Sequence, residues 1–172
     1  MSNYRRIHQP GGCWFFTVVT YQRQPWFKDL PNIQVLREAL AQVRRKRAFA
    51  IDAMVVLPDH LHCVLRLPEG DSDFSGRWRE IKKYVTNSLD VRRNHRGEGM
   101  VWQRRFWEHL IRDEDDWRRH MDYVHYNPVK HGYVNSPAQW RWSSFHRAVQ
   151  QGMYEASWGR SEPDSIFGMQ HE

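Results

Sequence analysis

Strand-like and helix-like patterns alternate along this chain, and their order is the feature that most constrains its fold. Aromatic and β-branched residues gather in short runs, whereas other segments repeat apolar residues at helical spacing. The expected strands cover residues 14–21, 48–57, 60–67 and 103–111. The expected helices cover residues 32–47, 76–94 and 113–127, and Pro128 is expected to end the last of them. This order predicts an α+β, ferredoxin-like βαββαβ fold: a four-stranded antiparallel sheet with helices on one face, followed by an added C-terminal helix.

The length of the chain, 172 residues, suits one domain with a core of its own. We expect this domain to cover residues 1–151. The remaining residues, 152–172, are polar and contain glycine and proline, so we expect a weakly ordered C-terminal tail. The tail carries more acidic than basic side chains, opposite to the rest of the chain, and is therefore a candidate competitor of DNA for the basic surface.

The net charge of +6 and the sequence pI of about 9.6 favour a polyanionic partner. Such a partner is either nucleic acid, which we favour slightly, or an anionic membrane. No segment approaches the roughly 18 apolar residues of a membrane-spanning helix. The two cysteines, Cys13 and Cys63, are far apart in sequence and do not suggest a disulfide framework. We therefore expect a cytoplasmic protein.

The segment HLHCVLRL predicts a strand with one core face, because alternate side chains of a strand share a face. Leu61, Cys63 and the following leucines line that core face. His60 and His62 share the other face, where two imidazoles could converge on one metal ion. The motif is weak in isolation, since two ordinary histidines would produce the same pattern.

The helix expected at residues 113–127 has an apolar stripe, formed by Trp117, Met121 and Val124, that should face the sheet. His120, Tyr123 and Asn127 lie along one flank of this stripe, at the edge of the expected interface. Tyr126 points almost directly away from it. Tyr123 is thus a candidate functional residue. The alternative is a structural tyrosine at the edge of the core, with its hydroxyl at the boundary with water.

A basic stretch covers residues 77–105, with nine basic side chains against three acidic ones. Aromatic side chains, such as Trp78 and Trp102, are interleaved with the charges. Cations for phosphates and rings for unstacked bases favour binding of single-stranded or hairpin DNA. The alternative is a solvated helix face whose aromatic residues turn toward the core.

These three features occur together in one family. The sequence resembles the REP-associated tyrosine transposases, relatives of the bacterial single-tyrosine HUH transposases. The resemblance covers about residues 3–151 and is carried by GGCWFFTVVT, LPDHLHCVLRLP and the segment ending in YNPVKHG. Leu61 fits the bulky apolar position between the two histidines of the HUH motif.

The resemblance implies a bacterial enzyme that cleaves and rejoins single-stranded DNA at REP-type hairpins. It implies that His60, His62 and Asn127 bind a divalent metal, Mg²⁺ or Mn²⁺, and that Tyr123 forms a 5′-phosphotyrosine intermediate. It also implies a monomer and no membrane partner. Candidate DNA contacts on this substrate are Arg5, Arg6, Arg77, Arg79, Lys82, Lys83, Arg104 and Arg105.

Two other functions stay open at this point. One is a protein that binds REP-type hairpins without cleaving them. The other is a metal-dependent hydrolase of a small substrate, for which Tyr123 would be dispensable. Covalent attachment of DNA to the protein separates the transposase from both alternatives.

Overall fold

The computed structural model describes residues 8–171. Arg5 and Arg6, two of the candidate DNA contacts, lie outside the described residues. The elements follow one another as β1 (Cys13–Val19), α1 (Leu30–Lys46), β2 (Ala50–Val56), β3 (His60–Arg66), α2 (Phe74–Ser88), β4 (Trp107–Leu110), α3 (Glu114–Lys130) and α4 (Phe145–Gln150). In this part of the chain no helix is long and apolar enough to cross a membrane.

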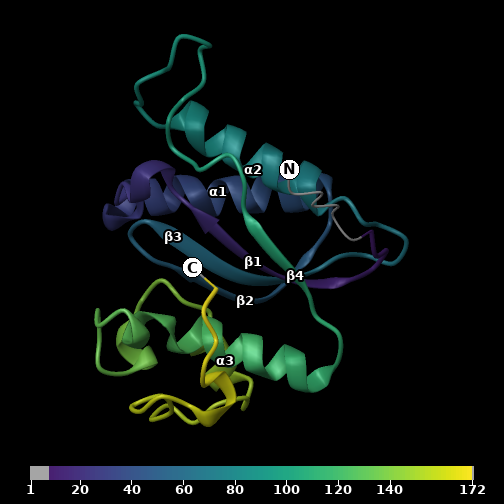
Figure 1. Cartoon of the computed structure of the whole chain (residues 1–172), viewed down its shortest axis with the longest axis vertical. Helices are drawn as coiled ribbons and strands as arrows, with labels where there is room; N and C mark the ends of the chain where they lie inside the picture. The colour runs from purple at the N-terminus through teal and green to yellow at the C-terminus, as the bar shows by residue number, and fades with distance from the viewer. Residues whose placement is uncertain (1–7, 172) are drawn as a thin grey trace.

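The four strands form one antiparallel sheet in the order β2-β3-β1-β4 (Figure 1). Strands β1 and β3 are central and pair along their whole length, from Cys13 opposite Arg66 to Val19 opposite His60. This is the predicted ferredoxin-like βαββαβ arrangement with an added helix, and the prediction of the fold class is confirmed.

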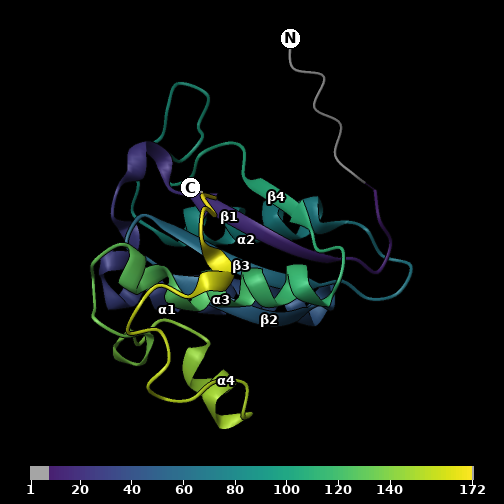
Figure 2. The ribbon, with the colours of Figure 1, turned by 60° about the horizontal axis from the view of Figure 1, so that its bottom comes forward.

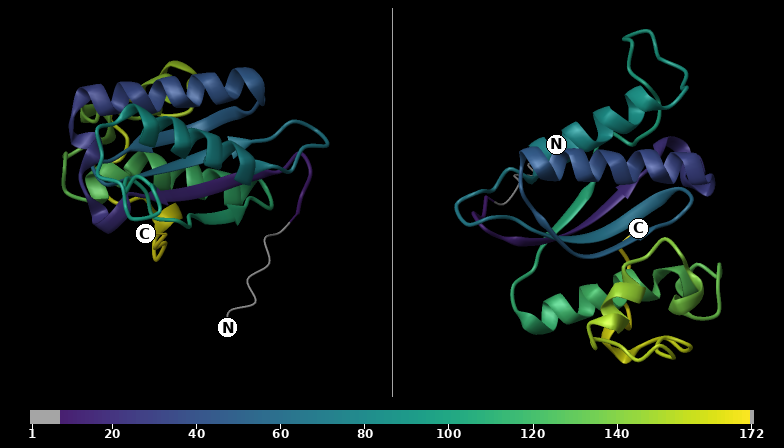
Figure 3. Two further views of the ribbon diagram at one scale, coloured as in Figure 1. Left: turned by 90° about the horizontal axis from the view of Figure 1, so that it is seen from above. Right: turned by 180° about the vertical axis from the view of Figure 1, so that it is seen from behind.

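The two helices of the ferredoxin-like unit share one face of the sheet, as expected, and the added helix covers the other face. Helices α1 and α2 lie side by side on one face, and α3 lies on the opposite face (Figures 1 and 3). The reason is that the central strands are apolar in both directions. Phe16 and Leu61 pack toward α1 and α2, while Phe15 and Val64 pack toward α3. A sheet with two apolar faces needs cover on each of them.

Helix α3 runs through Pro128 to Lys130, so the expectation that this proline ends the helix was wrong. A proline inside a helix removes one backbone hydrogen bond. Here the loss falls in the last turn, where three bonds close the helix end. The backbone N–H groups of His131, Gly132 and Tyr133 donate to the carbonyls of Asn127, Val129 and Pro128.

Two element boundaries also differ from expectation. Helix α2 ends at Ser88 rather than near Asn94, with the N–H of Leu89 bonded to the carbonyl of Val85. Strand β4 is only Trp107–Leu110. The basic residues between them form a loop that projects beyond α2 (Figure 1).

The C-terminal segment packs against α3, although its polar composition led us to expect weak order (Figure 2). Its few apolar side chains are placed where they can be buried: Ile166 is 2% exposed and Met169 8%. Hydrogen bonds supplement these contacts, since Tyr154 and Ser165 both donate to the carboxylate of Asp122 on α3. The acidic segment therefore covers the face opposite α2, away from the basic stretch.

Candidate active site

His60 and His62 lie on the sheet face that α3 covers, as strand alternation predicted. Their rings are 4.9 Å apart, and both side chains are fully buried. The ring of His62 also contacts the ring of Phe15 on β1. The two imidazoles therefore meet in a closed environment between the sheet and the helix.

The hydrogen bonds of the two rings assign their tautomers. The hydroxyl of Thr17 donates to the carbonyl of His171 at 2.6 Å, so its oxygen accepts the bond from Nδ1–H of His62 at 2.9 Å. The carboxylate of Asp59 accepts Nδ1–H of His60 at 2.6 Å. Each ring is then left with a lone pair on Nε2. Neither Nε2 has a hydrogen-bond partner among the residues that the structure describes.

The pKa values of both imidazoles are lowered, which favours their neutral forms. Burial lowers the pKa of His60, against the opposing effect of the Asp59 carboxylate. Burial also lowers the pKa of His62, far below its ordinary value, and the neighbouring His60 lowers it further. A neutral imidazole with a free Nε2 and a bonded Nδ1 is the form in which histidine binds a metal ion.

Asn127, one helical turn after Tyr123 on α3, carries a buried amide. Its side chain is fully buried, and within residues 8–171 neither its Oδ1 nor its Nδ2 has a hydrogen-bond partner. A buried amide without partners is costly. His131, directly after α3, places its ring 5.0 Å from that of His60. The buried nitrogens and the amide oxygen are a donor set that fits a divalent metal ion, with room for oxygen ligands from a substrate.

Tyr123 lies beside the histidine pair, one helical turn before Asn127. Its ring is 5.3 Å from that of His62. The phenol oxygen accepts hydrogen bonds from Nζ of Lys130 at 3.1 Å and from the backbone N–H of His171 at 3.2 Å. A candidate nucleophile, a cation and two candidate metal ligands are thus gathered in one place.

Tyr126 lies apart from this group, as the helical wheel predicted. Its ring contacts Trp158 of the C-terminal segment. Burial raises its pKa, and Glu162 adds to the shift. The phenol of Tyr126 is therefore packed against another element rather than directed toward the histidines.

Sequence reasoning missed several members of the site. Lys130 and His131 follow Tyr123 by seven and eight residues, a spacing that places them on the same side of a helix. Because we expected Pro128 to end the helix, this signal was lost. Thr17 and His171 carry no such signal, since only the folding of the chain brings them to His62.

Of the six candidate DNA contacts within the described residues, four line one pocket and two, Arg77 and Arg105, do not. Arg79, Lys82, Lys83 and Arg104 line one open pocket, together with residues of the loop after α2, such as Arg93 and Arg96. Arg105 is exposed nearby in sequence but does not line this pocket. Trp78 belongs to the core, as expected for an aromatic residue of an amphipathic helix.

Arg77 is a structural residue, and its assignment as a surface DNA contact was wrong. Its side chain is 1% exposed and forms an ion pair with Asp71 at 2.6 Å. It also donates to the backbone carbonyls of Arg47, Ala48 and Asp73. The guanidinium N–H groups of Arg77 therefore connect the start of α2 to the residues that follow α1.

Replacing Arg77 by methionine is expected to lower the free energy of unfolding by about 3–5 kcal/mol, since it leaves a carboxylate and three carbonyls without their donor. The exposed neighbour Arg79 is the matched control, and Arg79→Met should change stability by less than about 0.5 kcal/mol. Urea unfolding followed by tryptophan fluorescence measures both. Equal stability of the two variants would contradict the structural role.

Comparison with known proteins places the chain in a family. The model of the family described as "Transposase IS200 like" matches residues 14–127, a range that includes His60, His62, Tyr123 and Asn127. The chain belongs to the IS200-like transposase family. The relatives of this chain are thus transposases, enzymes that act on DNA.

Individual members of this transposase family are closely similar to the chain. The REP-associated tyrosine transposase of Escherichia coli K12 is 47% identical over 168 residues, which cover 98% of this chain and 97% of that protein. A relative from Haemophilus influenzae is 42% identical over 177 residues, covering 98% and 99%. A solved structure of a REP-associated tyrosine transposase bound to a REP hairpin superposes with a TM-score of 0.84 and 48% identity, covering 95% of this chain and 94% of the other.

Proposed function

We propose that this transposase is a metal-dependent single-strand DNA endonuclease and strand transferase that acts at REP-type hairpins through a 5′-phosphotyrosine intermediate. The observation that carries the proposal is the buried pair of Nε2 lone pairs on His60 and His62, adjacent to the ring of Tyr123. A merely structural histidine pair would be expected to satisfy both ring nitrogens.

In this proposal His60, His62 and Asn127 hold the metal ion, and His131 lies next to them. The candidate ions are Mg²⁺ and Mn²⁺, and the imidazole ligands favour Mn²⁺ of the two. The bound ion supplies charge neutralisation and orientation at the scissile phosphate. Asp59 and Thr17 act as positioning residues, because their bonds to Nδ1 keep Nε2 free.

Tyr123 performs the covalent step. Its phenol oxygen attacks phosphorus, the bond between phosphorus and the 3′ oxygen breaks, and a tyrosine–phosphate bond forms. The phenol loses its proton, and the released 3′ oxygen gains one. The energy of the phosphodiester is retained, so a second 3′-hydroxyl can reverse the step and rejoin the strand.

The basic pocket is the proposed hairpin site. It adjoins the end of β1, because the backbone N–H of Gln103 donates to the carbonyl of Val19, the residue opposite His60. Cations at the pocket would bind the phosphates of a folded hairpin, and the attached single strand would continue toward the histidines. The REP hairpin bound to the solved relative supports this type of substrate.

We further propose that the protein acts as a monomer. Tyr123 and the histidine pair of the same chain are already in contact, so a second chain is not needed to complete the site.

The experiment that tests the proposal uses a 3′-labelled, single-stranded REP-type hairpin with flanking sequence, incubated with the protein and Mn²⁺, because the fragment that stays on Tyr123 is the one that carries the 3′ end. The expected result is a covalent protein–DNA adduct that survives denaturing electrophoresis and disappears when the metal is chelated. Tight binding without any adduct would instead support the hairpin-binding alternative.

Lys130 is expected to assist the attack, since an ammonium group 3.1 Å from the phenol oxygen stabilises the phenolate. Lys130→Met should slow both cleavage and rejoining by roughly 10- to 100-fold, with hairpin affinity unchanged. Single-turnover rates of adduct formation measure the effect. The control is Lys46→Met, an exposed lysine at the end of α1. Equal rates for both variants would remove Lys130 from the mechanism.

A further inference from the structure

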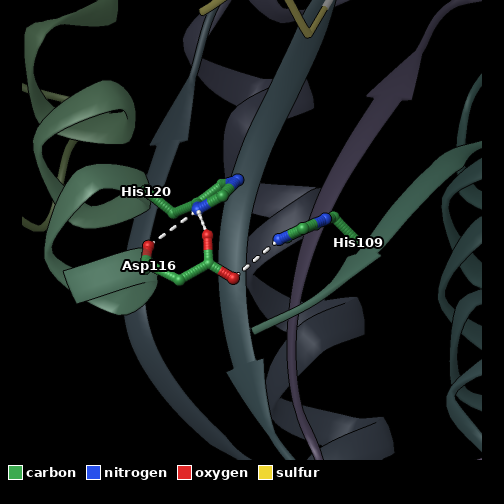
Figure 4. A group of neighbouring side chains, drawn as sticks. All are labelled: His109, Asp116 and His120. Atoms are coloured by element: carbon green, nitrogen blue, oxygen red, sulfur yellow. Dashed lines mark hydrogen bonds and ion pairs between the residues drawn. The ribbon is translucent and has the colours of Figure 1, made fainter. Parts of the chain in front are cut away.

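A second group of side chains that could hold a metal ion lies in the interface between the sheet and α3. His109 comes from β4, and Asp116 and His120 come from the first turns of α3, one turn apart (Figure 4). One ligand atom from each of the three residues lies within 4.8 Å of the others. None of these residues takes part in the proposed catalytic site.

The carboxylate of Asp116 lies between the two imidazoles. Its Oδ2 is 2.8 Å from Nε2 of His109, and its Oδ1 is 3.1 Å from Nδ1 of His120. The backbone N–H of Arg112 donates to Oδ2 at 3.0 Å and holds the carboxylate in place. Each oxygen therefore faces one ring nitrogen (Figure 4).

Ligand atoms bound at about 2.1 Å to one ion lie roughly 3.0–3.4 Å apart in octahedral or tetrahedral geometry. The 3.1 Å separation lies within this range, and the 2.8 Å separation is about 0.2 Å shorter than the lower end of the range. Two imidazoles and one carboxylate form a ligand set that first-row divalent metals use, with open positions for water or a substrate oxygen. An ion would replace the proton between Asp116 Oδ2 and His109. It would also replace the proton of His120 Nδ1, which lies 3.1 Å from Asp116 Oδ1 and 2.8 Å from the backbone carbonyl of Asp116.

The surroundings are also suitable for a cation. His120 is 4% exposed, and in the described part of the chain its Nε2 has no hydrogen-bond partner. The group borders an open pocket, which gives an ion a path from solvent. The carboxylates of this pocket outnumber its guanidinium groups, three to two: Asp113, Asp115 and Asp116 against Arg112 and Arg119.

We propose that His109, Asp116 and His120 bind a second divalent transition-metal ion, such as Mn²⁺, Co²⁺ or Zn²⁺, that joins the edge strand β4 to the helix carrying Tyr123. The two metal sites are neighbours, because the ring of Phe15 contacts both His62 and His120. They share no ligand, so each can be removed without the other.

The test is the number of ions bound per chain, measured by equilibrium dialysis with Mn²⁺ and by the visible absorption of bound Co²⁺. The wild-type protein should bind two ions. The variant His60→Ala/His62→Ala should retain one, and either His109→Ala or Asp116→Asn should retain the other. The combined variant should bind none. His146→Ala, which removes an exposed histidine of α4, is the matched control and should bind two.

Circular dichroism of each variant checks that the fold is kept, and Asp116→Asn serves if His109→Ala does not fold. The proposal is overturned if the wild-type protein binds at most one ion and this ion is lost in His60→Ala/His62→Ala. It is equally overturned if His109→Ala and Asp116→Asn bind as many ions as the wild type. Loss of binding only in these two variants would support the second site while contradicting the metal role proposed for His60 and His62.

Discussion

Replacing Tyr123 by phenylalanine is expected to abolish the covalent protein–DNA adduct and to lower the rate of strand cleavage by at least about 10³-fold, roughly 4 kcal/mol in the activation barrier. The substitution removes only the phenol oxygen, which Lys130 and His171 now contact. The ring itself keeps its contacts with Phe15 and His62. The fold and the hairpin affinity should therefore stay unchanged. Denaturing electrophoresis of labelled hairpin DNA measures the adduct.

Tyr126→Phe is the matched control for this experiment. Tyr126 is on the same helix, is also buried, and packs against Trp158 rather than the histidines. The Tyr126→Phe variant should form the adduct at the wild-type rate. Adduct formation by Tyr123→Phe together with its loss in Tyr126→Phe would exchange the two assignments. Full activity of Tyr123→Phe without any adduct would favour the hydrolase alternative.

The double variant His60→Ala/His62→Ala is expected to lose cleavage at every Mn²⁺ concentration, because the open Nε2 positions are gone. Hairpin binding should remain within about threefold of wild type, since the basic pocket is on the other side of the sheet from α3. Cleavage is measured as a function of Mn²⁺, and binding by fluorescence anisotropy in the absence of metal.

Two comparisons make this result specific. The single variants His60→Asn and His62→Asn keep a polar side chain in each buried position and should show cleavage reduced by about 10²-fold or more. His146→Ala, an exposed histidine, should behave like wild type. Cleavage by the double variant at a wild-type rate would refute the metal role of the pair.

Local patterns were sufficient for the order of the elements and for part of the site. The alternation in β3 placed His60 and His62 on one face because side chains of a strand alternate regardless of what covers them. Helical spacing separated Tyr123 from Tyr126, because successive side chains of a helix are rotated by a fixed angle whatever the helix packs against. Both inferences depend only on the geometry of one element.

The contacts between elements could not be inferred in this way. Pro128 suggested a helix end, but hydrogen bonds after the last turn allow α3 to continue to Lys130. Arg77 looked like a surface cation, yet carbonyls from α1 and the following residues surround it. The polar C-terminal segment packs on α3 through two buried apolar side chains, Ile166 and Met169.

The sequence alone therefore established the βαββαβ order, the shared face of the histidines and the separation of Tyr123 from Tyr126, since each follows from the repeat of a single strand or helix. Tertiary structure decided which nitrogen of each histidine is free, which cation reaches the phenol and where the C-terminal segment lies. These depend on pairs of residues far apart in the chain, such as Thr17 with His62 and Tyr123 with His171. Local periodicity carries no information about such pairs, because only packing of the whole chain brings them within hydrogen-bonding distance.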